Sequence, residues 1–190
     1  GENHPQVATR LNNLGGLLKA QGLLDQALPL YERALSIQEK SLGAEHPDVA
    51  TVLNNLAGIY YRMNRHDEAI PLYKRSLAIK EAALGRHHPD VALTLNNCAE
   101  CLKSQNKYEE ALPLFRRSLV ITENSLGATH PDLSKLLSNT AGLLLKMSRV
   151  EEAVPMYERA LHIAEVNVGH DHDSVAQRLL NLAVALQANK

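Results

Sequence analysis

The sequence repeats itself every 42 residues, and this period constrains the fold more than any other feature. His-Pro pairs recur at this spacing without an insertion, beginning at His4, His46, His88 and His130, with His172-Asp173 as a degenerate fifth copy. A fixed period of this length is typical of a solenoid, in which each unit buries its apolar face only by stacking on its neighbours. We therefore expect a single repeat domain, residues 1–190, with units 1–42, 43–84, 85–126 and 127–168 and a half unit 169–190.

Each unit is predicted to begin with a helix that starts at the His-Pro pair. In His46-Pro47-Asp48 the proline can occupy the first helical position, and the aspartate favours the positive end of the helix dipole. An apolar stripe at helical spacing follows, formed by Leu53, Leu56, Ala57 and Tyr60. This helix should end at a residue suited to left-handed backbone; Gly22, Asn64 and Asn106 fit that requirement well, and Ser148 fits it less well.

A second helix is predicted from about Asp67 to Ala83, with Gly85 ending it. Ala69, Tyr73, Ser76 and Leu77 should face inward. Pro71 lies several residues inside this helix, where it removes one backbone hydrogen bond and should bend the helix. The whole chain is therefore expected to be all-α, with nine helices.

The residues at these positions resemble the tetratricopeptide repeat, in its 42-residue kinesin light chain and nephrocystin type. The matching residues are Leu53, Leu56, Ala57, Tyr60, Ala69, Tyr73 and Ser76, together with the motifs Leu-Asn-Asn-Leu, Glu-Ala-x-Pro-Leu-Tyr and Leu-Gly-x-x-His-Pro. The resemblance implies a right-handed α-solenoid of four and a half helix-turn-helix repeats. It also implies a non-catalytic scaffold or adaptor that binds peptide segments of partner proteins in a concave groove lined by the first helices.

A row of asparagines follows the polar face of the first helices. Asparagine and glycine cost a helix roughly 0.5–1 kcal/mol each relative to alanine, so their repetition on this face needs a reason. The row consists of Asn13, Asn55, Asn97, Asn139 and Asn181. Two roles stay open: a hydrogen-bonded ladder between helices, and recognition of a peptide backbone, since a carboxamide both donates and accepts. Asn13, Asn55, Asn97 and Asn139 are the candidate peptide-binding residues.

Residues that differ between units on the same face are the expected source of specificity. These candidates are Tyr61, Arg62, Lys103, Lys135 and Lys146. Cations outnumber the single Glu100 there, so we expect a mildly basic groove that binds a short acidic peptide segment. The alternative is that these long cations only solvate a surface.

Composition excludes several other classes of function. With 20 Lys+Arg against 21 Asp+Glu the net charge is -1, which gives no field to attract nucleic acid. The apolar runs are far shorter than the ~20 residues that cross a bilayer, so no membrane association is expected. Only two cysteines occur, three residues apart, which suits a reducing compartment and predicts a cytoplasmic protein.

No residue cluster predicts an enzyme, a cofactor or a metal site. Cys98 and Cys101 fall in the middle of a helix and supply only half a zinc site, so we interpret them as core residues. The recurring histidines are expected to cap the first helices. Arginines also recur in the second helices, at Arg33, Arg75, Arg117 and Arg159. With acidic residues nearby, these arginines are expected to pair between repeats rather than to bind a ligand.

The half unit 169–190 is expected to expose an apolar face. Leu179, Leu182, Ala183 and Leu186 have no following second helix within the sequence to cover them. We therefore expect possible self-association through this C-terminal half repeat. The main alternative to a peptide-binding adaptor is thus a structural spacer or self-association element of a larger signalling or transport protein.

Overall fold

The computed structural model describes residues 4–170 and 172–188. Residues 1–3, 171 and 189–190, which include the outer ends of the first unit and of the final half unit, lie outside the described residues. The described residues form nine helices and no strand. These are α1 (Pro5–Ala20), α2 (Leu24–Leu42), α3 (Pro47–Arg62), α4 (His66–Leu84), α5 (Pro89–Ser104), α6 (Tyr108–Leu126), α7 (Pro131–Lys146), α8 (Val150–Val168) and α9 (Asp173–Ala188).

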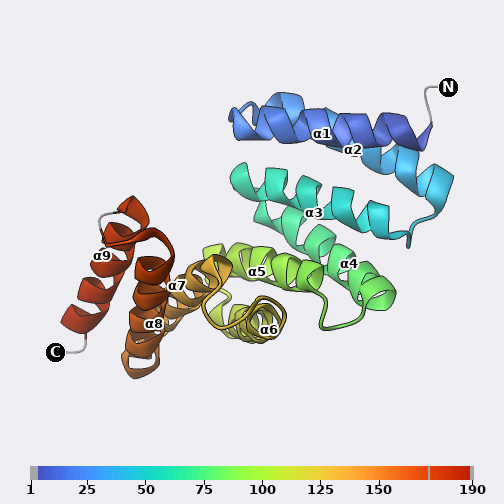
Figure 1. The fold of residues 1–190 in the computed structure, drawn as a ribbon. Helices are drawn as coiled ribbons and strands as arrows, with labels where there is room; N and C mark the ends of the chain where they lie inside the picture. The colour runs from blue at the N-terminus through green and yellow to red at the C-terminus, as the bar shows by residue number, and fades with distance from the viewer. Residues whose placement is uncertain (1–3, 171, 189–190) are drawn as a thin grey trace. The chain divides into compact units, whose positions relative to one another are not determined.

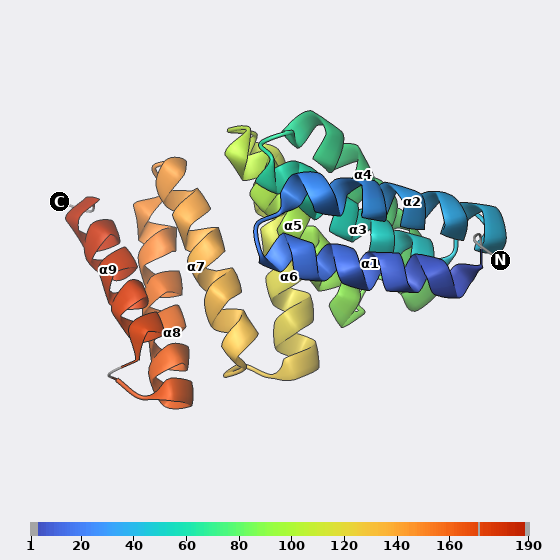
Figure 2. The ribbon, with the colours of Figure 1, turned by 90° about the horizontal axis from the view of Figure 1, so that it is seen from above.

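The helices group into two structural units, Gly1–Cys101 and Leu102–Lys190. In the first unit α1 packs on α2, α3 packs on α4, and α2 also contacts α3 (Figure 1). In the second unit α6, α7, α8 and α9 lie side by side in chain order (Figure 2). These helices therefore pack on their neighbours in sequence, as expected of a stacked repeat array. In the described part of the chain, no helix combines the length and the hydrophobicity needed to span a bilayer.

The odd-numbered helices begin where the His-Pro pairs predict. The Nδ1 atom of His46 accepts a hydrogen bond from the backbone N–H of Asp48 at 3.2 Å, and Pro47 is the first helical residue. The same cap recurs at His4, His88, His130 and His172. The prediction that these histidines cap the first helices is confirmed, because their ring nitrogens satisfy N–H groups that the helix leaves unpaired.

Helices α1, α3, α5 and α7 each end at a residue with left-handed backbone, and backbone hydrogen bonds close the turn there. Asn64 has φ of 59°, and the N–H groups of Asn64 and Arg65 donate to the carbonyl oxygens of Tyr61 and Tyr60 at 3.0 and 2.8 Å. This is the Schellman arrangement. Ser148 takes the same conformation, with φ of 59°, although serine fits it less well than asparagine or glycine. The repeat geometry thus sets the backbone there, whatever the side chain.

The second helices run slightly beyond their predicted ends. Helix α4 extends from His66 to Leu84, and Gly85 follows with φ of 85°. Pro71 lies inside α4, is exposed, and leaves the helix uninterrupted. The bend expected at this proline stays a prediction.

The inward faces agree with the predicted stripes. Ala69 and Ser76 are fully buried and Tyr73 is 2% exposed, whereas Leu77 is only half-buried. The Ser76 hydroxyl donates to the carbonyl of Ala50 at 2.7 Å. Two repeats later the donor lies on the first helix instead of the second, since Ser134 of α7 donates to the carbonyl of Ala160 at 2.7 Å. A small hydroxyl residue facing an alanine therefore links the two helices of these repeats.

Arginines of the second helices link consecutive repeats. Arg75 pairs with Glu39 of the preceding second helix at 2.6 Å and donates to the loop carbonyl of Ala44 at 2.9 Å. Arg159 makes the equivalent contacts with Glu123 at 2.5 Å and with the carbonyl of Ala128. Pairing between repeats is confirmed for these two arginines.

Candidate functional site

A cavity of about 540 Å³ lies on the first-helix face of the first unit. We call it the α1/α3 cavity, because α1 and α3 supply all of its lining except one tyrosine of α2. Its lining residues are Asn12, Asn13, Gly16, Leu17, Lys19, Ala20, Tyr31, Asn55 and Arg62. This lining brings together three of the predicted site residues, Asn13, Asn55 and Arg62.

The charge in this lining is entirely positive. Lys19 and Arg62 are the only ionisable side chains other than Tyr31 among the described residues that line the cavity, and neither pairs with a carboxylate of the described chain. Burial and, secondarily, the neighbouring positive charge of Arg62 lower the pKa of Lys19. Both causes penalise the charged ammonium, so an anion placed in the cavity would be stabilised there.

Arg62 also has a structural contact. Its Nη1 donates to the carbonyl of Lys19 at 2.8 Å, near the C-terminal end of α1, and the same carbonyl also accepts from the backbone N–H of Gly22 at 3.1 Å. The guanidinium has five N–H donors and is exposed, which leaves donors facing the cavity.

Two asparagines of the row make inter-helix hydrogen bonds, in line with the ladder that was one of its two roles. Asn55 donates through Nδ2 to Oδ1 of Asn12 at 2.9 Å, and Asn97 donates to Oδ1 of Asn54 at 3.3 Å. Asn55 and Asn97 remain half-buried, so the row is neither sealed inside the core nor fully exposed. A carboxamide that makes one such bond keeps further donor and acceptor capacity, and the ladder therefore leaves the binding role open.

The remaining predicted residues do not line the α1/α3 cavity. The Tyr61 ring lies 5.5 Å from the ring of His66 and is half-buried. Lys103, in the second unit, has its Nζ atom 5.7 Å from the centroid of the Phe115 ring. On α7, Lys135 and Lys146 are exposed and Asn139 is half-buried.

Tyr31 is a lining residue that the sequence does not identify as a site residue. It belongs to the buried stripe of α2, yet its hydroxyl lies 3.6 Å from the position that a Cβ atom on Gly16 would occupy. The signal in the sequence is a glycine of the first helix that recurs together with a tyrosine of the second helix.

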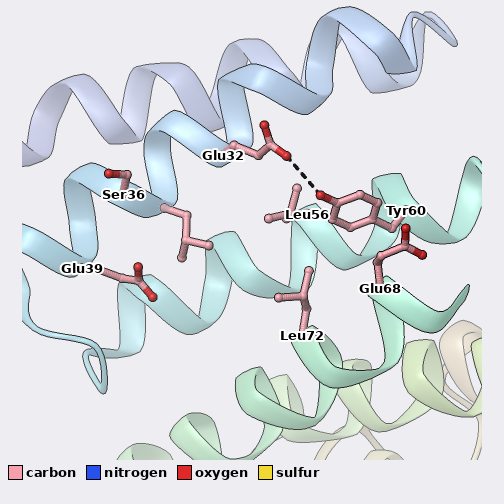
Figure 3. A pocket seen from close by; sticks show the side chains of 8 residues that line it. Glu32, Ser36, Glu39, Leu56, Tyr60, Glu68 and Leu72 are labelled. Carbon is pink, nitrogen blue, oxygen red and sulfur yellow. Dashed lines mark hydrogen bonds between the residues drawn. The ribbon is translucent and has the colours of Figure 1, made fainter. Parts of the chain in front are cut away.

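A second cavity in the first unit has a structural explanation. It has a volume of about 340 Å³ and lies between α2, α3 and α4, with Glu32, Glu39 and Glu68 around leucines (Figure 3). Tyr60 donates to Glu32 at 3.0 Å, Arg75 pairs with Glu39, and Arg65 pairs with Glu68 at 2.9 Å. All three carboxylates of this cavity are therefore partnered within the chain.

The second unit has a cavity of about 490 Å³ in the same place between consecutive second helices. Leu119, Glu123, Glu152 and Met156 line it, two repeats along from Leu35, Glu39, Glu68 and Leu72. A crevice that recurs with the repeat follows from helix stacking, and we do not assign it a ligand.

The cysteines lie in the core, as the sequence indicates. Cys98 and Cys101 are free and fully buried, and Sγ of Cys101 lies 3.7 Å from Nδ1 of His66. Among the residues that the structure describes, no group of three or more histidine, cysteine or acidic side chains could hold a metal ion.

Comparison with known proteins identifies the family. The tetratricopeptide repeat model matches residues 6–82, 48–124, 90–165 and 132–190. The kinesin-light-chain-type protein of Podosopora anserina with nearly identical TPR-like repeats superimposes with a TM-score of 0.86 at 26% identity, over 98% of this chain and 88% of that chain. BtubC (BKLC) from P. vanneervenii gives 0.85 at 25% identity, over 97% of this chain and 74% of that chain.

A more distant structure shares the fold alone. Aspartyl phosphate phosphatase F from Bacillus subtilis has a TM-score of 0.81 at 16% identity, over 96% of this chain and 46% of that chain. A search of curated proteins finds no significant match. The repeat model covers nearly all of the sequence, and the structures at 25–26% identity are kinesin light chain-like repeat proteins. This chain belongs to the tetratricopeptide repeat family, and its fold is an all-α solenoid of the kinesin light chain-like type.

Proposed function

We propose that this chain is a protein-interaction scaffold that binds a short acidic segment of a partner along its first helices. Tetratricopeptide repeats are generally non-catalytic scaffolds for protein partners, and the family assignment supports that general role. The proposal adds the chemistry of the partner and places its anchor in the α1/α3 cavity.

The observation that carries the proposal is the uncompensated positive charge of this cavity. Lys19 and Arg62 line a space of about 540 Å³ without a carboxylate partner in the described chain. A glutamate or aspartate side chain would stabilise the charged ammonium of Lys19, which burial disfavours. Charge-assisted hydrogen bonds of this kind are stronger than neutral ones.

The other predicted residues have the following roles in the proposal. Asn13, Asn55, Asn97 and Asn139 would hold the backbone of the bound segment, because carboxamides match both peptide donors and peptide acceptors. Lys103, Lys135 and Lys146 would attract further acidic residues, and Tyr61 would contribute to side-chain specificity.

Titration of fluorescein-labelled acidic dodecapeptides, followed by fluorescence anisotropy, tests this function. Glutamine-for-glutamate versions of the same peptides serve as ligand controls. We expect Lys19→Met and Arg62→Gln each to weaken binding by about tenfold, as the loss of a charge-assisted hydrogen bond predicts. Lys40→Met removes the same charge from an exposed position of α2 outside the cavity, and should leave affinity nearly unchanged.

Salt provides an independent check, because added salt should weaken genuine binding of an acidic peptide. Asn55→Ala and Asn97→Ala should also reduce affinity. The proposal fails if the acidic peptides bind no better than their glutamine versions, or if Lys19→Met weakens binding no more than Lys40→Met does.

A second role, self-association, is favoured by the surface of α9. Leu179, Leu180, Val184 and Leu186 are 46–58% exposed in this chain. Under this alternative, light scattering at rising protein concentration would show a growing mass that Leu186→Glu abolishes. A mass that stays monomeric in both proteins would exclude this role.

We further propose that the protein works in the cytoplasm. Two free, buried cysteines support a reducing compartment, where thiols stay unpaired. Localisation of a fluorescently tagged chain in cells would test this.

A further inference from the structure

Three tyrosines of the second helices lie beneath glycines of the first helices. A Cβ atom on Gly16 would lie 3.6 Å from Oη of Tyr31, and one on Gly58 would lie 3.5 Å from Oη of Tyr73. On Gly142 the corresponding distance to Oη of Tyr157 is 3.3 Å. In each of these repeats, therefore, the absent side chain leaves a gap in the first helix at the tip of a tyrosine.

The rings of these tyrosines are buried, but their hydroxyls make no hydrogen bond within the described part of the molecule. Tyr31, Tyr73 and Tyr157 are 1%, 2% and 5% exposed, and burial raises the pKa of all three. The hydroxyls consequently stay protonated and keep a hydrogen to donate. None of the three makes a hydrogen bond to another group of the described residues. The three hydroxyl oxygens are not among the fully buried unpartnered atoms, so each keeps some exposure and its O–H can donate to a ligand or to water.

Packing does not explain the hydroxyl. In the third repeat the same position is Phe115, which is fully buried, so a phenyl ring fills this site in the core. The glycine is lost in the same repeat, where Glu100 stands at the position of Gly16, Gly58 and Gly142. The glycine gap and the tyrosine hydroxyl thus occur together and disappear together. Each glycine costs its helix about 1 kcal/mol relative to alanine, which makes an unused gap unfavourable.

The α1/α3 cavity shows where such a gap leads. Gly16 and Tyr31 both line this cavity, beside Asn13 and Asn55. At Gly58 the gap is shared, since Nζ of Lys19 would lie 3.2 Å from a Cβ atom there. The tyrosine tip, the carboxamides and the lysine therefore face the same space at the first-helix surface.

We propose that Tyr31, Tyr73 and Tyr157 donate hydrogen bonds through these glycine gaps to main-chain carbonyl oxygens of the bound peptide. This inference rests on the proposed function and names the chemical groups of the peptide that the site recognises. A donor that recurs with the repeat matches an acceptor that recurs along a peptide, and the main-chain carbonyl is the acceptor that every peptide residue supplies. Sequence-independent affinity would come from these bonds, and the charged residues would supply the preference for acidic segments.

Tyr31→Phe is the direct test, because Phe115 shows that the core accepts phenylalanine at this position. We expect the variant to unfold at the same temperature as the wild type and to bind the labelled acidic dodecapeptides about threefold to tenfold more weakly, as the loss of one neutral hydrogen bond predicts. The fold-loss should be equal for the acidic peptides and for any of their glutamine versions that bind measurably. A loss confined to the acidic peptides would show that the acceptor is a carboxylate and would overturn the main-chain assignment.

Gly16→Ala closes the gap without disturbing the ring. Its Cβ atom would contact only Oη of Tyr31, at an ordinary distance of 3.6 Å. Since alanine is the better helix former, the variant should unfold at a higher temperature than the wild type, yet should bind more weakly. A purely structural role of the glycine would not separate stability from affinity in this way.

Gly15→Ala is the matched control on the same helix. A Cβ atom there would lie 2.9–3.1 Å from three ring carbons of Tyr31, which cannot move aside easily, so this variant should be less stable than the wild type. If the wild type binds and both Tyr31→Phe and Gly16→Ala bind equally well, the inference is overturned and the proposed function stands. If no acidic dodecapeptide binds the wild type, the proposed function fails and this inference fails with it.

Discussion

Equivalent positions in successive repeats carry different side chains in nearly the same surroundings. One such position, near the end of each second helix, is occupied by Gln38, Lys80 and Thr122, all buried. Lys80 donates to Oγ1 of Thr94 at 3.0 Å, and its burial lowers its pKa. One repeat earlier Val52 stands where Thr94 stands, and Oε1 of Gln38 has no hydrogen-bond partner. The polar side chain at this position therefore has a hydrogen-bond partner in one repeat, whereas an oxygen of its counterpart in the preceding repeat has none.

Gln38→Met should stabilise the protein. Methionine has a similar length and removes the unpartnered acceptor, so the free energy of unfolding should rise by about 1 kcal/mol. Urea unfolding followed by circular dichroism would measure it. Gln26→Met, at an exposed position of the same helix, should change little; a loss of stability in Gln38→Met would contradict the assignment of Gln38 as unsatisfied.

The sequence identifies the asparagine row but not its pairing. Helical spacing places Asn13, Asn55 and Asn97 on one face. The observed bond joins Asn55 to Asn12 and not to Asn13. Which of the two asparagines is reached depends on how far neighbouring helices slide along each other, and a pattern within one helix does not contain that offset.

At the scale of the helix, boundaries follow from short-range chemistry and were predictable. The His-Pro start, the left-handed end at Asn64 and the glycine stop at Gly85 all depend on residues within one or two turns. The role of Tyr31 did not follow, because its place in an apolar stripe predicts only that the ring is buried. Whether the hydroxyl reaches the first-helix surface depends on the distance between two helices, and Gly15 permits their close approach because a Cβ atom there would lie 2.9–3.1 Å from ring carbons of Tyr31.

Ser148 is the helix end that the repeat imposes on an ill-suited residue. It has φ of 59° without the advantage of glycine or asparagine, so Ser148→Gly should raise the free energy of unfolding by about 1 kcal/mol, less the entropy that glycine adds to the unfolded chain. Thermal unfolding would measure the change. Asn64→Gly, at the equivalent end of α3, should gain less, and an equal gain in both variants would show that serine is no worse than asparagine there.

At the scale of the whole molecule, the class of fold was predictable because a repeat array is built from contacts between neighbours in sequence. One unit and its period contain most of that information. The charge of the α1/α3 cavity was only partly predictable, since Lys19 and Arg62 are 43 residues apart and meet only when α1 and α3 stack.

Affinity for an acidic peptide should depend on pH through Lys19. The free protein holds the pKa of Lys19 below its ordinary value of 10.5, and a bound carboxylate favours the protonated ammonium and raises that pKa. At a pH above the lowered pKa of Lys19, peptide binding therefore takes up a proton. The affinity should consequently fall as the pH rises above that pKa. Anisotropy titrations from about pH 7 to pH 10 would measure the slope, while Lys19→Met should bind weakly and with little pH dependence. An equal slope in both proteins would contradict the role of Lys19.

The arginine contacts between repeats have a mechanical consequence. Arg75 and Glu39, like Arg159 and Glu123, hold adjacent second helices together with side chains that are 32–39% exposed, where ions in solution reach them. The two helices of each repeat are held together by their own buried apolar stripe. The contact between one repeat and the next depends partly on these arginine–glutamate ion pairs. High salt should accordingly weaken the contacts between adjacent repeats before it unfolds the helix pairs themselves. The array would then become more flexible while its helix content stayed constant.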